Sequence, residues 1–290
     1  MPEPSLRTLS RPGDEHIGYV VTPARGARRH TLLLIHGLAS NLTRWSEFVA
    51  ATSLLESCTL IQTDLRGHER SPTRQRISLD LWCDDLAALL DAEGAAPAIC
   101  VGHSLGAQVA LHFAARQPDR VAAVALIDPV FRAALHGRMR GLAIARPLFI
   151  AAAVIVRAIN ATGIGRRTLP PLDLRALDVV AREALRSPSS EAEFITRYSS
   201  MWADLRTFHT AHYLQEVAEM FAPLPLLERI GQPALVVLST GATFANVEAM
   251  AAQARRLPRA RIATIACHHW PLTERPAEVR QAIETWVATL

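Results

Sequence analysis

Lysine is absent from this chain, so all 31 of its basic side chains are arginines. A lysine amine forms the Schiff base with carbonyl substrates and with pyridoxal phosphate. A lysine also completes the phosphate-binding loop of P-loop enzymes. The lack of lysine therefore excludes these chemistries, and no other motif in the sequence implies a cofactor.

Aromatic residues and cysteines are also scarce. Aromatic side chains make up 6% of the chain, and no nucleic-acid-binding motif accompanies the net charge of +4, so we expect no nucleic-acid partner. No C-x-x-C spacing links the four cysteines, which are Cys58, Cys83, Cys100 and Cys267. Three of them lie in or beside apolar runs, which indicates buried free thiols and not disulfides or a metal site.

Residues 1–16 are polar and lack the apolar run of a secretory signal, so we expect a cytoplasmic protein.

The chain is long and rich in apolar residues, because 50% of its 290 residues are hydrophobic. That is enough for one domain with a large core and an insertion.

Apolar strand-like runs alternate with helical patterns along most of the chain. The expected strands cover residues 16–22, 31–35, 59–63, 96–101, 121–127, 234–238 and 260–265. The expected helices cover residues 42–55, 79–92, 105–116, 246–256 and 276–288. This alternation predicts an α/β fold, in which helices flank a mostly parallel central sheet.

The alternation stops over residues 131–230, which are mostly helical in pattern. We predict that this segment is a helical cap, or lid, over a core formed by residues 1–130 and 231–290. Six of its large side chains fit either an apolar substrate pocket or ordinary packing between cap and sheet, and they are Met201, Trp202, Phe208, Tyr213, Met220 and Phe221.

The segment Gly102-His103-Ser104-Leu105-Gly106 fits the pattern G-x-S-x-G. It lies between an expected strand and an expected helix, where this pattern forms a sharp turn with the serine at its apex. The glycines leave room that a Cβ atom would fill. We therefore predict that Ser104 is a nucleophile and that His103 is a packing residue of the turn.

A serine hydroxyl needs a base within hydrogen-bond reach and donors for the developing oxyanion. Residues 267–271, with the sequence Cys-His-His-Trp-Pro, follow the last expected strand. A histidine there lies at the carboxyl edge of the sheet, which is also the edge of Ser104. Ligand sites of open α/β sheets lie at this edge.

Several motifs in this order make the chain resemble the α/β-hydrolase superfamily over nearly everything outside the insertion. Besides the serine turn, they are His36-Gly37-Leu38 followed by Trp45, the Asp64-Leu65-Arg66-Gly67-His68-Glu69-Arg70-Ser71 turn, and the terminal run His268 to Pro276. Glu69 and His268 stand where glycine is usual. The resemblance implies that His269 is the catalytic base and that the backbone amides of Leu38 and Leu105 form the oxyanion hole. It implies no metal and no cofactor.

The acid of the triad departs from the usual pattern of the family, in which it follows the strand before the last. Here that loop, residues 239–246, contains no carboxylate. Asp128 ends the strand after the nucleophile helix, at the same sheet edge, and some family members place the acid there. Two alternatives remain open: Asp128 only turns the chain before Pro129, or the triad has no acid. In a serine protease, replacement of the triad aspartate by asparagine lowers kcat about 10⁴-fold.

The first part of the cap has an uneven charge pattern. Residues 131–172 contain no Asp or Glu, but they include Arg132, Arg138, Arg140, Arg146, Arg157, Arg166 and Arg167. The apolar run 147–156 among them is about half of the ~20 residues that span a bilayer. We expect this run to pack into the core, with its arginines paired to the acidic second half of the cap. The alternative is a weak contact with an anionic lipid surface.

These features predict a serine hydrolase for small-molecule esters, thioesters or lactones with an apolar acyl part. A serine at the turn argues against the family's haloalkane dehalogenases and most of its epoxide hydrolases, which attack through a carboxylate. Two alternatives remain open: a C–C bond hydrolase or perhydrolase, which uses the same residue types, and a catalytically weak ligand-binding member, which the missing acid after the penultimate strand suggests. His209 and His212 lack further ligands for a metal site, so we expect them in the pocket or in solvent.

Overall fold

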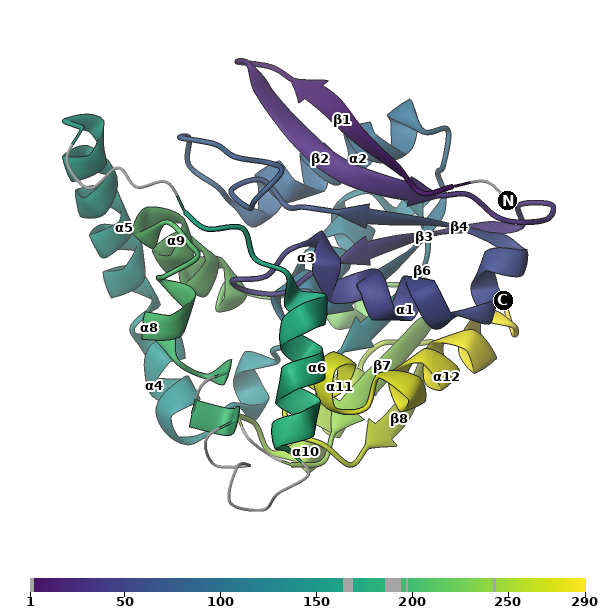
Figure 1. Ribbon diagram of the computed structural model, residues 1–290. Coiled ribbons are helices and arrows are strands. Elements are labelled where there is room, and N and C mark those ends of the chain that lie inside the picture. The colour runs from purple at the N-terminus through teal and green to yellow at the C-terminus, as the bar shows by residue number, and fades with distance from the viewer. Residues whose placement is uncertain (1–2, 164–168, 186–193, 197, 242–243) are drawn as a thin grey trace.

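An eight-stranded sheet forms the centre of the molecule in the computed structural model, which describes residues 3–163, 169–185, 194–196, 198–241 and 244–290 (Figure 1). The strand order is β1-β2-β4-β3-β5-β6-β7-β8, and all neighbours are parallel except for the pairs that β2 forms with β1 and β4. The strands are β1 Ser5–Arg11, β2 Glu15–Thr22, β3 His30–Ile35, β4 Cys58–Thr63, β5 Ala98–His103, β6 Val121–Ile127, β7 Ala234–Ser239 and β8 Ala260–Ile265.

Continuous apolar runs form the central strands because helices cover both faces of the sheet. Side chains alternate between the faces, so Leu33 and Ile35 of β3 join one hydrophobic cluster while Leu32 and Leu34 join the other. The first cluster includes residues of α2 (Leu79–Ala92), α3 (Leu105–Arg116) and α10 (Val247–Ala254). The second includes residues of α1 (Ser46–Ala51) and α12 (Pro276–Val287).

The predicted fold class is confirmed, and so are the free, buried states of all four cysteines. Three details of the sequence interpretation are wrong. Strand β1 was not expected, because an exposed edge strand needs few apolar residues and its Leu6 faces solvent. The expected helix 42–55 is broken into η1 (Leu42–Trp45), α1 and η2 (Ser53–Glu56). Strand β5 starts at Ala98, since Pro97 has no N–H for the ladder, and extends through His103.

A helical insert lies between β6 and β7, and most of it forms the left part of the molecule in Figure 1. Of the residues discussed above, Arg166, Arg167, Ala242 and Thr243 lie outside the described parts of the chain. The described helices of the insert are α4 (Gly137–Ile144), α5 (Arg146–Ala161), α6 (Leu174–Ala184), α8 (Met201–Asp204) and α9 (Thr210–Met220).

The expectation that residues 147–156 pack into the core is wrong. This run lies in α5, which packs against α9 at the outer edge of the molecule, and Ala153 is its only buried residue (Figure 1). Within the described part of the chain, the arginines of residues 131–163 form no ion pair with any carboxylate. Arg146 of α5 instead donates to the Ala218 carbonyl oxygen of α9 at 2.8 Å.

Candidate active site

Ser104 lies at a strained turn between β5 and α3. Its backbone has φ of 51° and ψ of −112°, a left-handed conformation that is uncommon for a residue with a side chain. A Cβ on Gly102 would lie 2.2 Å from the Gly106 carbonyl oxygen, and one on Gly106 would lie 2.3 Å from the Ile35 carbonyl oxygen. Only glycine therefore fits at either position, which is the physical basis of the G-x-S-x-G pattern.

The structure brings the three predicted triad residues into one chain of contacts. Nε2 of His269 lies 3.0 Å from Oγ of Ser104, within hydrogen-bond reach. Nδ1 of the same ring lies 3.2 Å from Oδ2 of Asp128. The three residues come from the ends of β5, β6 and β8, so the parallel sheet is what places them together.

Asp128 is held by Ser239, a residue that the sequence interpretation did not single out. The Ser239 amide donates to Oδ1 at 2.7 Å, and the Ser239 hydroxyl donates to Oδ2. Burial opposes ionisation of Asp128, but hydrogen bonds from His269 and Ser239 outweigh it and place its pKa below the usual value. Residues 239–246 thus contain no acid, and Ser239 at the end of β7 instead supplies two donors to Asp128, which follows β6.

The loop that carries His269 is fixed from two sides. The backbone amides of His268 and Trp270 donate to the Glu274 carboxylate at 3.0 and 3.4 Å. Nε2 of His103 lies 3.1 Å from the His269 carbonyl oxygen and donates to it. Burial lowers the pKa of His103 to about 3, so its ring is a neutral donor and holds the loop without adding charge beside His269.

The two amides predicted to form an oxyanion hole lie on adjoining segments. Leu38 belongs to the loop after β3, which passes close to the serine turn, since a Cβ on Gly37 would lie 3.1 Å from the His103 carbonyl oxygen. Leu105 begins α3, where amides have no acceptor within the helix. Among the residues described, neither amide donates a hydrogen bond. The N-terminus of α3 also favours negative charge.

Glu216 of α9 connects the cap to the loop that carries Leu38. Its Oε2 accepts a hydrogen bond from the Ala39 amide at 3.0 Å, and its Oε1 lies 3.1 Å from Nε2 of His68. Glu216 is fully buried, and Ala39 has a left-handed backbone with φ of 46°. A buried carboxylate of the cap therefore fixes the residue next to Leu38. No sequence motif singled out Glu216.

A cavity of about 950 Å³ opens between the sheet edge and the cap, with Ser104 and His269 in its wall. The walls are mostly apolar and include Val130, Leu135, Leu142, Phe149, Val217, Met220 and Met250. Besides Asp128, one further Asp and three Arg side chains line it, namely Asp204, Arg44, Arg138 and Arg206. Cavities of this size and character accommodate small organic molecules.

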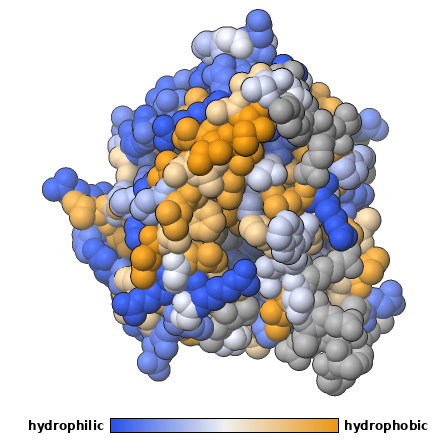
Figure 2. Space-filling model, turned by 90° about the vertical axis from the view of Figure 1, so that its left-hand side faces the viewer, coloured by the Kyte–Doolittle hydropathy of each residue, from blue (hydrophilic) through white to orange (hydrophobic). Residues whose placement is uncertain are grey.

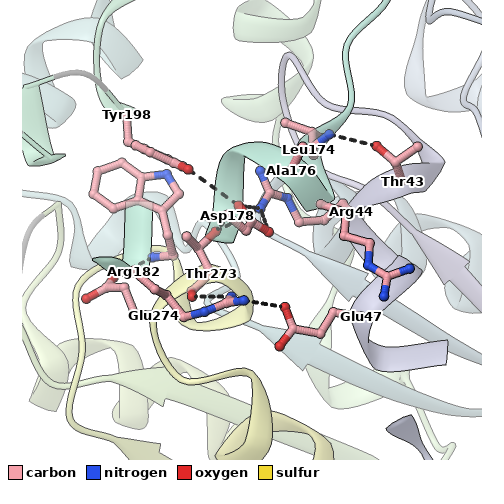
Figure 3. A network of polar contacts seen from close by, with 12 residues as sticks. Thr43, Arg44, Glu47, Leu174, Ala176, Asp178, Arg182, Tyr198, Thr273 and Glu274 are labelled. Atoms are coloured by element: carbon pink, nitrogen blue, oxygen red, sulfur yellow. Dashed lines mark hydrogen bonds and ion pairs between the residues drawn. The ribbon is translucent and has the colours of Figure 1, made fainter. Parts of the chain in front are cut away.

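A buried polar network fastens α6 of the cap beside this cavity (Figure 3). Nη1 of Arg44 donates to both Asp178 oxygens at 2.6 Å and to the Thr273 hydroxyl at 2.7 Å. The Thr273 hydroxyl in turn donates to Asp178, and the Tyr198 hydroxyl donates to the same carboxylate. The network joins η1, the cap and α11 (Pro271–Glu274), which directly follows the His269 loop.

The other candidate residues have mixed outcomes. Met201, Tyr213 and Met220 line the cavity, but Trp202 is exposed, and both Phe208 and Phe221 are buried outside the lining. His212 is buried, with Nε2 3.3 Å from the Gln75 carbonyl oxygen, and burial lowers its pKa to about 4. In the described part of the chain, no cluster of three or more His, Cys, Asp or Glu side chains could hold a metal ion.

Comparisons with known proteins agree with the α/β fold and with the arrangement of this site. A family profile described as "alpha/beta hydrolase fold" matches residues 30–276. The chain is similar to Lipase LipV of Mycobacterium tuberculosis, with 38% identity over 145 residues that make up 49% of this chain and 53% of the lipase. It is also similar to 2-hydroxymuconate semialdehyde hydrolase of a Pseudomonas species, at 31% identity over 33% of this chain and 35% of that protein. The matches span about half the length of these curated relatives or less.

Two solved structures illustrate the likeness in three dimensions. A thermophilic esterase from Thermogutta terrifontis has a TM-score of 0.67 and 22% identity, over 99% of this chain and 98% of that chain. The enol-lactonase from Burkholderia xenovorans has a TM-score of 0.68 and 20% identity, over 97% of this chain and 100% of that chain. At such identities the likeness concerns the fold alone.

Proposed function

The chain belongs to the α/β-hydrolase fold family, and from this premise we propose that it is a serine hydrolase that cleaves esters, thioesters or lactones with an apolar acyl part. The observation that carries the proposal is the continuous contact chain from Ser104 through His269 to Asp128 in the wall of a mostly apolar cavity. A serine activated by a histidine that a carboxylate orients is the arrangement that acyl transfer requires.

In the proposed mechanism, His269 accepts the Ser104 proton as the serine oxygen attacks the substrate carbonyl. The amides of Leu38 and Leu105 stabilise the oxyanion of the tetrahedral intermediate. His269 then gives the proton to the leaving group, which departs and leaves an acyl group on Ser104. A water molecule, deprotonated by His269, releases the acid by the same steps in reverse. Asp128 keeps the proton of the neutral ring on Nδ1 and stabilises the imidazolium that forms.

Two features support an apolar acyl part as the substrate class. The cavity walls are mostly apolar, which favours a hydrocarbon chain over a polar one. The similar proteins include a lipase, an esterase and an enol-lactonase. The name of one relative describes the hydrolysis of a semialdehyde, so C–C bond hydrolysis remains the second candidate.

The test is hydrolysis of p-nitrophenyl esters from acetate to palmitate by wild type and by Ser104→Ala, together with labelling by a fluorophosphonate. We expect turnover and labelling by wild type, loss of both in Ser104→Ala, and a chain-length optimum set by the cavity. His269→Gln should also lose turnover, while His268→Gln, at the adjacent histidine, is the matched control. Labelling without ester turnover would favour C–C hydrolysis, and an unlabelled wild type would favour a ligand-binding protein.

A further inference from the structure

The outer face of α5 is apolar and uncovered. Leu148, Val154, Ile155 and Ile159 are exposed by 71%, 62%, 59% and 46%, and Ile144 at the end of α4 by 71%. Leu148, Ile155 and Ile159 recur at helical spacing and therefore share one face of α5. Figure 2 shows hydrophobic residues gathered on this side of the molecule, with hydrophilic residues around them. Contiguous apolar surface of this kind usually marks an interaction site.

The charges within the segment that carries this face are all of one sign. No Asp or Glu occurs between residues 131 and 172, whereas Arg132 and Arg140 are exposed. Arg140 lies one helical turn before Ile144, so its side chain shares a face of α4 with an exposed apolar residue. An apolar ridge with arginines and no carboxylates is complementary to a partner that is apolar inside and anionic at its surface.

The inner sides of α4 and α5 face the cavity. Leu142 and Phe149 line the cavity, and Nε of Arg146 donates to the Ala218 carbonyl oxygen at 2.8 Å, which fixes α5 on α9. Among the described helices, none is by itself long and apolar enough to span a bilayer, and the pair α4 and α5 is bent by 60°. With 16 residues, α5 is about 24 Å long. This geometry suits a helix that lies along a surface.

We propose that the outer face of α5, together with Arg140 and Ile144 of α4, binds the surface of an anionic phospholipid bilayer. The ten consecutive apolar residues 147–156 offer no side-chain hydrogen bonds to a partner. A protein interface would require about one hydrogen bond per 100–200 Å², whereas acyl chains require none. The arginines then lie at the level of the lipid phosphates, with which they pair. Docking in this way brings the lipid surface next to the cavity wall that Phe149 forms.

The experiment is cosedimentation of the Ser104→Ala protein with phosphatidylcholine vesicles, with and without phosphatidylglycerol. We expect binding that rises with phosphatidylglycerol and falls with salt. Leu148→Ser with Ile155→Ser should lower the partition coefficient by roughly tenfold or more. Arg140→Gln should lower it about fivefold on anionic vesicles only. Leu6→Ser is the matched control, because Leu6 is 64% exposed on β1, outside the cap.

Two results would overturn the proposal. One is vesicle binding that does not depend on the phosphatidylglycerol content, and the other is binding that the Leu148→Ser and Ile155→Ser changes do not weaken. A further outcome against it is a dimer in sedimentation equilibrium that the same two changes dissociate, because the face would then bind another copy of the chain. Thermal unfolding of each variant checks that the fold is kept, and Ile159→Ser provides an independent test of the ridge. Since the Ser104→Ala protein is used throughout, the result does not depend on the proposed hydrolysis.

Discussion

Replacement of Asp128 by asparagine is the sharpest test of the proposed triad. The change replaces one carboxylate oxygen with an NH₂ group and keeps the size of the side chain. The Ser239 amide donates to Oδ1 at 2.7 Å, so the remaining oxygen must take the Oδ1 position. The new NH₂ group then occupies the Oδ2 position, 3.2 Å from Nδ1 of His269.

Two donors would face each other there unless His269 changes its tautomer. With Nδ1 as the acceptor, the ring proton moves to Nε2, which then cannot accept the proton of Ser104. In a serine protease the same substitution of the triad aspartate lowers kcat about 10⁴-fold. That factor corresponds to about 5.5 kcal/mol of transition-state stabilisation. The Ser239 hydroxyl can turn to accept from the NH₂ group, so we expect the melting temperature to change little.

The assay is steady-state hydrolysis of the best p-nitrophenyl ester, with circular dichroism and thermal melting of each protein. Asp91→Asn is the matched control, since Asp91 is an exposed aspartate that pairs with Arg120 on the surface. A folded Asp128→Asn protein whose kcat is within about tenfold of wild type would refute the reasoning. In that case Asp128 only turns the chain, and the acid is elsewhere or absent.

Three further predictions follow from buried groups of the structure. Burial raises the pKa of Asp204 to about 7, so the stability that its protonated form provides is present below about pH 4 and is lost as the pH rises through about 7. Between pH 4 and pH 8, the free energy of unfolding of Asp204→Asn should therefore rise relative to that of wild type by on the order of 3 kcal/mol, as measured by thermal unfolding. If the free energies of unfolding of the two proteins change in parallel with pH, this prediction is contradicted. Glu216→Ala removes the acceptor of the Ala39 amide and should lower kcat by up to about 100-fold with little change in KM, while Glu216→Gln keeps most activity. Gly106→Ala should destabilise the protein by about 3 kcal/mol or more in urea unfolding, whereas Gly141→Ala, at an open helical position, should stabilise it by about 0.5–1 kcal/mol.

The elements of the core could be predicted because their signals are local. Helix α3 has the predicted bounds 105–116, since its apolar stripe and the glycines of the turn before it lie within a few residues of each other. Strand β1 was missed because nothing in its own seven residues demands burial. It forms only because β2 offers an antiparallel edge, and that pairing is a property of two segments.

The cap was predicted as a helical insert, but its packing could not be. The run 147–156 has the composition of a buried helix, and composition alone does not say which elements cover it. Only the three-dimensional arrangement shows that α9 covers one side and that Leu148 and Ile155 remain exposed. The same limit applies to Arg44 and Asp178, which are 134 residues apart in the chain and form a buried ion pair.

The sequence by itself determined the fold class, the strained serine turn and the histidine after the last strand, because each rests on short-range spacing and on the common edge of parallel strands. The tertiary structure decided which carboxylate meets His269. Four strand ends converge on that point, and the loop that lacks an acid contributes Ser239 to orient Asp128. It also placed Glu216 against the Ala39 amide and turned the apolar face of α5 outward. Such contacts depend on distances between segments far apart in the chain, which residue spacing does not encode.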